Sequence, residues 1–66
     1  MIVPQSLWEK DVMRKCPRVA DVEAQMAYIR SLMERNPAHH AKQRDWQRKL
    51  NFLLRLREHR AAGRGI

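Results

Sequence analysis

Residues 38–60, AHHAKQRDWQRKLNFLLRLREHR, decide the fold because they lie within the longest stretch that contains neither glycine nor proline. Leucine, lysine, arginine and glutamine dominate it, and all four are good helix formers. At about 100° per residue, one face of this predicted helix carries Trp46, Leu50, Leu53 and Leu54. This is the spacing of a helix that buries one stripe. We place Phe52 and Leu56 on the flank of the stripe, where they widen the apolar arc.

The opposite face of the same helix is basic. Arg44, Arg48 and Arg55 lie within about 40° of one another around the helix axis, and Asn51 lies between them. Since the apolar stripe is the side that needs a partner, we expect the arginine side to stay in solvent.

Local signals in the first half of the chain predict two further helices. Ser6 and Glu9 have the S-x-x-E spacing of a capping box, which indicates a short helix from Leu7 to about Lys15. Pro17 breaks or bends the chain and is acceptable in the first turn of the next helix. That second helix is predicted to run to about Arg35, with an apolar stripe of Val22, Met26, Ile29 and Met33.

Asn36 and Pro37 separate the second helix from the third. Asparagine is a good N-cap and proline a good first helical residue, so we expect them to start the third helix. Two helices joined by so short a connection favour an antiparallel hairpin. The last helix is predicted to end near Ala61.

The predicted fold is therefore all-α, with a short N-terminal helix followed by an antiparallel two-helix hairpin. We treat residues 1–66 as one small domain, with 1–5 as an entry arm and 62–66 as a flexible basic tail. A chain of this size buries a modest fraction of its surface. We therefore expect self-association or a partner to complete the fold, through Trp8, Phe52 and Leu56.

The charge of the chain is high and uneven. The formal net charge is +7, and residues 38–66 hold eight of the fourteen lysines and arginines against two acidic residues. Such a balance points to a polyanionic partner, with nucleic acid first. The predicted nucleic-acid contacts are Lys42, Arg44, Arg48, Arg55, Arg57, Arg60 and Arg64.

Several other classes of protein are not indicated by the sequence. No apolar run approaches the roughly 20 residues needed to cross a bilayer, and the N-terminus does not resemble a secretory signal. Cys16 is the only cysteine, so no intramolecular disulfide forms, and His39 and His40 are adjacent rather than spaced as zinc ligands. We expect an intracellular protein, in the cytoplasm or an organelle matrix, with no cofactor, no metal and no catalytic activity.

Two analogies bear on function. The Val22-Glu23-Ala24-Gln25 start, a histidine-containing turn and a basic leucine-rich helix resemble a small-subunit ribosomal protein built on a helical hairpin. Pro37 departs from the connection of that family, and its His-Ser-Arg-Arg-type signature is missing, so we assign no family. The architecture also resembles hairpin regulators of plasmids and phages. Two hypotheses remain: binding of nucleic acid, RNA slightly ahead of DNA and possibly within a ribonucleoprotein, or docking of a phage- or plasmid-type regulator on a host protein.

Overall fold

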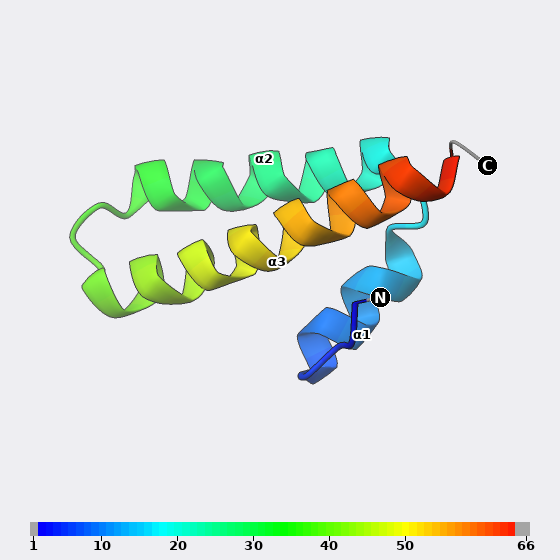
Figure 1. Cartoon of the computed structure of the whole chain (residues 1–66). Coiled ribbons are helices and arrows are strands. Elements are labelled where there is room, and N and C mark those ends of the chain that lie inside the picture. The colour runs from blue at the N-terminus through cyan, green and yellow to red at the C-terminus, as the bar shows by residue number, and fades with distance from the viewer. Residues whose placement is uncertain (1, 65–66) are drawn as a thin grey trace.

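In the computed structural model, residues 2–64 form three helices and no strand (Figure 1). Helix α1 spans Leu7–Lys15, α2 spans Val19–Arg35 and α3 spans His40–Arg64. The description covers the backbone of residues 2–64 and the side chains as far as Gly63, so residues 65 and 66 of the predicted tail lie outside it. Helices α2 and α3 lie side by side as a hairpin, and α1 lies at an angle to them at the end away from the connecting loop. The predicted all-α hairpin after a short helix is confirmed.

The start of α1 is capped almost as the sequence predicts. The backbone N–H of Glu9 donates to the Ser6 hydroxyl over 3.1 Å. The Glu9 carboxylate, however, accepts from the N–H of Gln5 over 2.7 Å rather than from that of Ser6. The carboxylate therefore holds the end of the N-terminal arm, residues 2–5, against the first turn of the helix.

Both later helices begin further along the chain than predicted. Pro17 lies outside α2, whose N-cap is Arg18, and the N–H of Arg18 donates to the Asp21 carboxylate over 3.2 Å. Asn36 closes α2 instead of capping α3, which starts only at His40, so this prediction was wrong. At its other end, α3 continues to Arg64, beyond the predicted end near Ala61.

Gln43 explains why residues 36–39 form a separate turn. Its side-chain amide donates from α3 to the carbonyl oxygens of Met33 and Asn36, each over 2.9 Å. These carbonyls belong to the last turn of α2, where intrahelical donors run out. The side-chain amide of Asn36 donates to the carbonyl oxygen of Leu32 over 2.9 Å. One glutamine from the next helix thus closes the hairpin.

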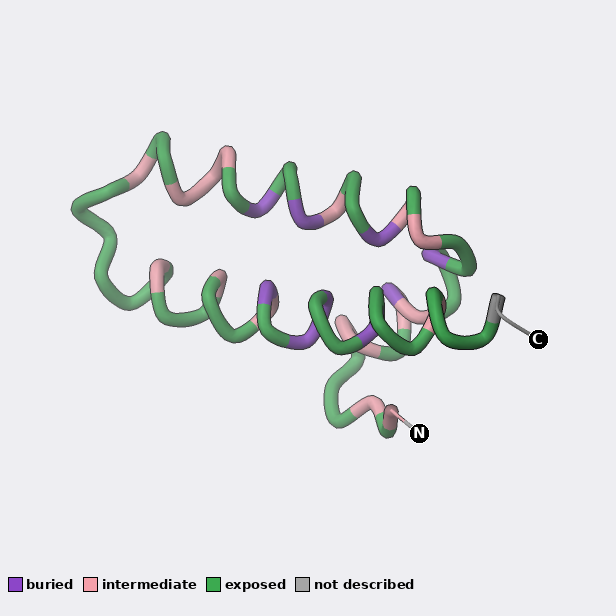
Figure 2. The backbone as a smooth tube through the Cα atoms, turned by 45° about the horizontal axis from the view of Figure 1, so that its top comes forward, coloured by how far each residue is buried: buried purple, intermediate pink, exposed green. Residues whose placement is uncertain are grey.

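The core lies between the facing sides of α2 and α3 (Figure 2). Val22, Met26 and Ile29 are buried, as the α2 stripe predicts, and Leu50 and Leu53 meet them from α3. Two parts of the α3 prediction were wrong. Leu54 is 41% exposed, whereas Phe52 and Leu56 are 3% and 0% exposed.

Helix α1 is the physical reason for this shift of the buried arc. It supplies Val12 and Cys16 to the same core and brings the Trp8 ring edge-on to Phe52, with 6.0 Å between ring centroids. Helix α3 therefore has neighbours on two sides rather than one. Phe52 and Leu56 are covered within the chain, so they do not form the open patch that we predicted for self-association.

Arg60 fastens α1 to α3. Its guanidinium donates to the carbonyl of Cys16 over 3.2 Å and to that of Met13 over 2.9 Å. Both carbonyls lie at the C-terminus of α1, where they lack helical donors and where the helix dipole favours a cation. None of the helices found in residues 2–64 has the length and apolar character that a membrane crossing requires.

Candidate nucleic-acid interface

Arg44, Arg48 and Arg55, which we call the arginine face, point away from the core. All three side chains are exposed. On α3 they lie opposite Leu50 and Leu53, whereas Phe52, which meets Trp8 of α1, lies beside them at the edge of the buried side. Among the described residues, none of the three forms an ion pair with a carboxylate. Their guanidinium groups are therefore available to an external anion.

The arginine face is long enough to meet several phosphates. Arg44 and Arg55 are eleven positions apart, which corresponds to about 16 Å along a helix. Between them, the Gln47 amide donates to the Asn51 side-chain oxygen over 3.2 Å, and both residues are exposed. Gln47 and Asn51 remain on the surface, whereas Gln43, the third polar side chain of this segment, is used by the hairpin turn.

The other predicted contacts have different surroundings. Lys42 is exposed, and Arg57 pairs with Glu23 of α2 over 3.2 Å, with both side chains about half exposed. Arg60 is committed to the α1 carbonyls and is only partly exposed, so it belongs to the fold rather than to a free cationic surface. The side chain of Arg64 lies outside the described residues. The sequence placed all of these side chains in one set because it cannot show which cations have internal partners.

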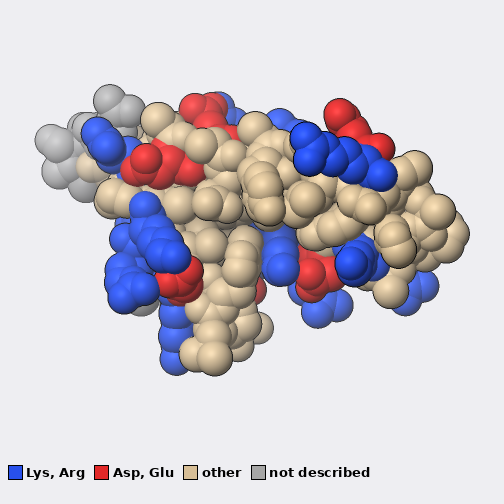
Figure 3. Space-filling view, turned by 180° about the vertical axis from the view of Figure 1, so that it is seen from behind, with Lys and Arg blue, Asp and Glu red and all other residues tan. Residues whose placement is uncertain are grey.

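Elsewhere, many cations are paired with carboxylates. On α1, Asp11 accepts from Arg14 over 2.8 Å and lies 3.0 Å from the Lys15 ammonium. Hydrogen bonds from Lys15 and then Arg14 hold the pKa of Asp11 below its ordinary value. On the face seen from behind, basic side chains lie beside acidic ones at several places (Figure 3). Among the described residues, Arg44, Arg48 and Arg55 have no carboxylate partner, and the same holds for Lys10, Arg30, Arg35 and Lys42. The arginine face is distinguished by three such cations on one side of a single helix.

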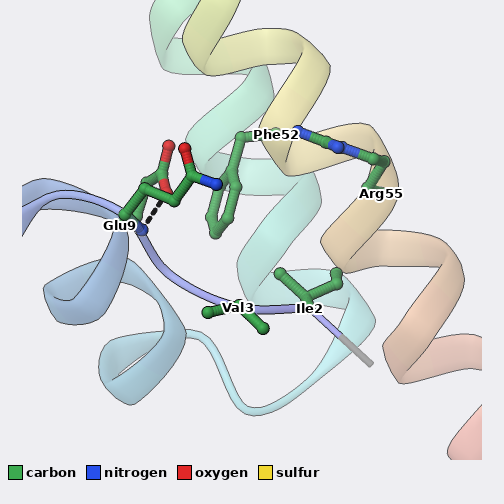
Figure 4. A pocket seen from close by; sticks show the side chains of 6 residues that line it. Ile2, Val3, Glu9, Phe52 and Arg55 are labelled. Atoms are coloured by element: carbon green, nitrogen blue, oxygen red, sulfur yellow. Dashed lines mark hydrogen bonds between the residues drawn. The ribbon is translucent and has the colours of Figure 1, made fainter.

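Two hollows border the arginine face where the N-terminal arm and α1 meet α3. The first, which we call the arm hollow, has a volume of about 400 Å³ and is lined by Ile2, Val3, Gln5, Glu9, Phe52 and Arg55 (Figure 4). The second, which we call the Trp8 hollow, measures about 260 Å³ and is lined by Gln5, Ser6, Trp8, Glu9, Asp45, Arg48 and Lys49. Sequence reasoning missed both hollows, since they depend on how the bend between α1 and α2 places α1 and the N-terminal arm against α3.

Lys49 occupies part of the Trp8 hollow. Its ammonium lies 5.2 Å from the centroid of the Trp8 ring and 3.0 Å from the Asp45 carboxylate. A cation held over an aromatic face is stabilised by the ring quadrupole. Lys49, which the sequence-based set omitted, therefore adds positive charge beside Arg48.

The cysteine and the histidines form no metal site in the part of the chain that the structure describes. Cys16 is buried, and burial raises the pKa of its thiol. His39 and His40 are exposed, and residues 2–64 contain no group of three or more His, Cys, Asp or Glu side chains that could hold a metal ion.

Comparison of the chain with known protein families, with characterised proteins and with solved structures found no match in any of the three.

Proposed function

We propose that this protein binds nucleic acid, RNA ahead of DNA, through the arginine face of α3 and carries out no catalysis. The observation that carries the proposal is the exposure of Arg44, Arg48 and Arg55 on one side of α3, without carboxylate partners among the described residues. The planar guanidinium fork suits phosphate oxygens, and a net charge of +7 favours association with a polyanion.

Docking on a host protein is the rival function. It was expected to use an open apolar patch that contains Phe52 and Leu56. Since both side chains are buried by the chain's own α1, that surface is absent from the described fold. The patch expected for the rival is therefore not exposed among the described residues, whereas the arginine side expected for nucleic acid is exposed.

The test replaces Arg44, Arg48 and Arg55 together with glutamine. A matched control replaces Lys10, Arg30 and Arg35, which are exposed on α1 and α2. Both variants lower the formal charge from +7 to +4. Binding of a fluorescent RNA hairpin and of a DNA duplex is measured by anisotropy across a salt series.

Loss of the three contacts should flatten the slope of log K against log salt by roughly two to three, because each phosphate contact contributes about 0.7–0.9. The control should keep most of the slope, and both variants should keep the helical circular dichroism of the wild type. Equal losses in the two variants would show that net charge, and not this face, governs binding. If the wild type binds neither probe at low salt, the proposed function is wrong.

A further inference from the structure

We infer that the seam formed by the arm hollow and the Trp8 hollow receives unpaired nucleotides, so that the bound nucleic acid is single-stranded or bulged at this point. The inference rests on the proposed function and names its ligand more closely: bases enter the two hollows, and their phosphates meet the arginine face.

The basis is that each hollow joins an aromatic side chain to a member of the arginine face. Phe52 and Arg55 line the arm hollow, and Trp8 and Arg48 line the Trp8 hollow, where a base must displace Lys49 from the Trp8 ring. Arg48 and Arg55 are seven positions apart, which gives about 10 Å along the helix. Aromatic surfaces beside a positively charged track are the usual combination in proteins that bind single strands, since bases stack on the rings while cations follow the backbone.

The arm hollow has walls suited to a base. Phe52 lines it from α3 with only 3% of the side chain exposed, and Ile2 and Val3 line it from the N-terminal arm (Figure 4). Val3 is 66% exposed and forms the outer lip. Only a base that has left the stacking and pairing of a duplex can enter such a hollow.

Polar groups between the hollows match the edges of bases. Gln5 and Glu9 line both hollows, and one oxygen of the Glu9 carboxylate accepts from the Gln5 N–H over 2.7 Å. A carboxylate accepts hydrogen bonds from the exocyclic amino groups of bases and repels phosphate. This arrangement orients a nucleotide with its base toward Glu9 and its phosphate toward Arg48 or Arg55.

Three RNA probes test the inference: a duplex, the same duplex with a central bulge of two adenosines, and the same bulge with two abasic residues. The abasic probe keeps the flexible backbone and removes only the bases. The wild type should bind the adenosine bulge about tenfold more tightly than the abasic bulge, as expected for base–aromatic stacking. Equal affinities for these two probes would overturn the inference while leaving the proposed function intact.

The arm hollow is tested by Val3→Asp, which places a carboxylate at its lip, with Leu7→Asp as the matched control. Leu7 is 83% exposed and lines neither hollow. Since both variants change the charge equally, the ratio of affinities for the adenosine and abasic bulges is the readout. Val3→Asp should lower that ratio severalfold and Leu7→Asp should not. An unchanged ratio in Val3→Asp would exclude the arm hollow. Binding of no probe by the wild type would instead refute the proposed function.

Discussion

Arg57 and Arg60 lie one turn apart on α3, and the structure assigns them very different contributions to stability. The informative change is Arg60→Met, which keeps an unbranched apolar stem and removes the guanidinium donors. Arg57→Met is the matched control because it makes the same change in charge and side chain. Arg60 donates to two carbonyls of α1, whereas Arg57 makes one ion pair with Glu23 at the surface.

The expected magnitudes follow from these contacts. Hydrogen bonds from a charged donor contribute about 1.5–3 kcal/mol, and water can replace part of this because the site is only partly buried. We expect Arg60→Met to lower the free energy of unfolding by about 2–3 kcal/mol. Arg57 and Glu23 are 48% and 51% exposed, and exposed pairs contribute about 0.2–1 kcal/mol.

Thermal unfolding followed by circular dichroism separates the two cases. In a domain of this size, 1 kcal/mol shifts Tm by about 4–8 °C, so Arg60→Met should melt about 10–20 °C lower than the wild type. Arg57→Met should melt within about 8 °C of it. If the two variants melt together, Arg60 does not fasten α1, and our assignment of its guanidinium to the fold is wrong.

Three further predictions concern the core, the hairpin turn and the thiol. Leu53→Ala should cost about 2–5 kcal/mol in urea unfolding, because Leu53 is 0% exposed, whereas Leu54→Ala should cost well under half as much. Gln43→Ala removes both donors to the α2 carbonyls and should cost about 1–2 kcal/mol in the same assay. Burial raises the pKa of Cys16, so the folded state holds the thiol proton more tightly than the unfolded chain. The stability from this group is complete below about pH 9.0 and is lost as the pH rises further. The Tm difference between wild type and Cys16→Ala should therefore shrink from pH 8 to pH 10.

The sequence predicts the helices well because their ends are determined locally. The Ser6 cap and the proline breaks act within a few residues, and the α2 stripe follows from one helical period. The predicted starts of α2 and α3 are wrong by two or three residues. At the start of α3, groups distant in the sequence form hydrogen bonds that the local pattern does not show. Asn36, whose type also suits the start of α3, instead ends α2: its side-chain amide donates to the Leu32 carbonyl, and Gln43 of α3 donates to the Asn36 carbonyl.

The misplaced part of the core has a tertiary cause. A helical stripe read from sequence assumes one partner, and that assumption placed Leu54 inside and Phe52 and Leu56 on the flank. In the structure, α1 also packs against α3, and this second neighbour adds a second buried side to α3. The packing of α1 against α3 also creates the two hollows and brings its C-terminal carbonyls to Arg60. The spacing of residues along α3 therefore predicted neither the hollows nor the role of Arg60.

The attachment of α1 also separates the molecule into two folding units. The α2–α3 hairpin closes through a four-residue turn, whereas the Arg60 hydrogen bonds join residues 44 and 47 positions apart. Short loops close at low entropic cost, so we expect the hairpin to form before α1 docks. In the native ensemble, release of α1 is then a partial opening that leaves the hairpin intact. We expect such an opening to uncover Phe52, which Trp8 covers in the closed chain, and so to offer apolar surface to another chain only in this minor state.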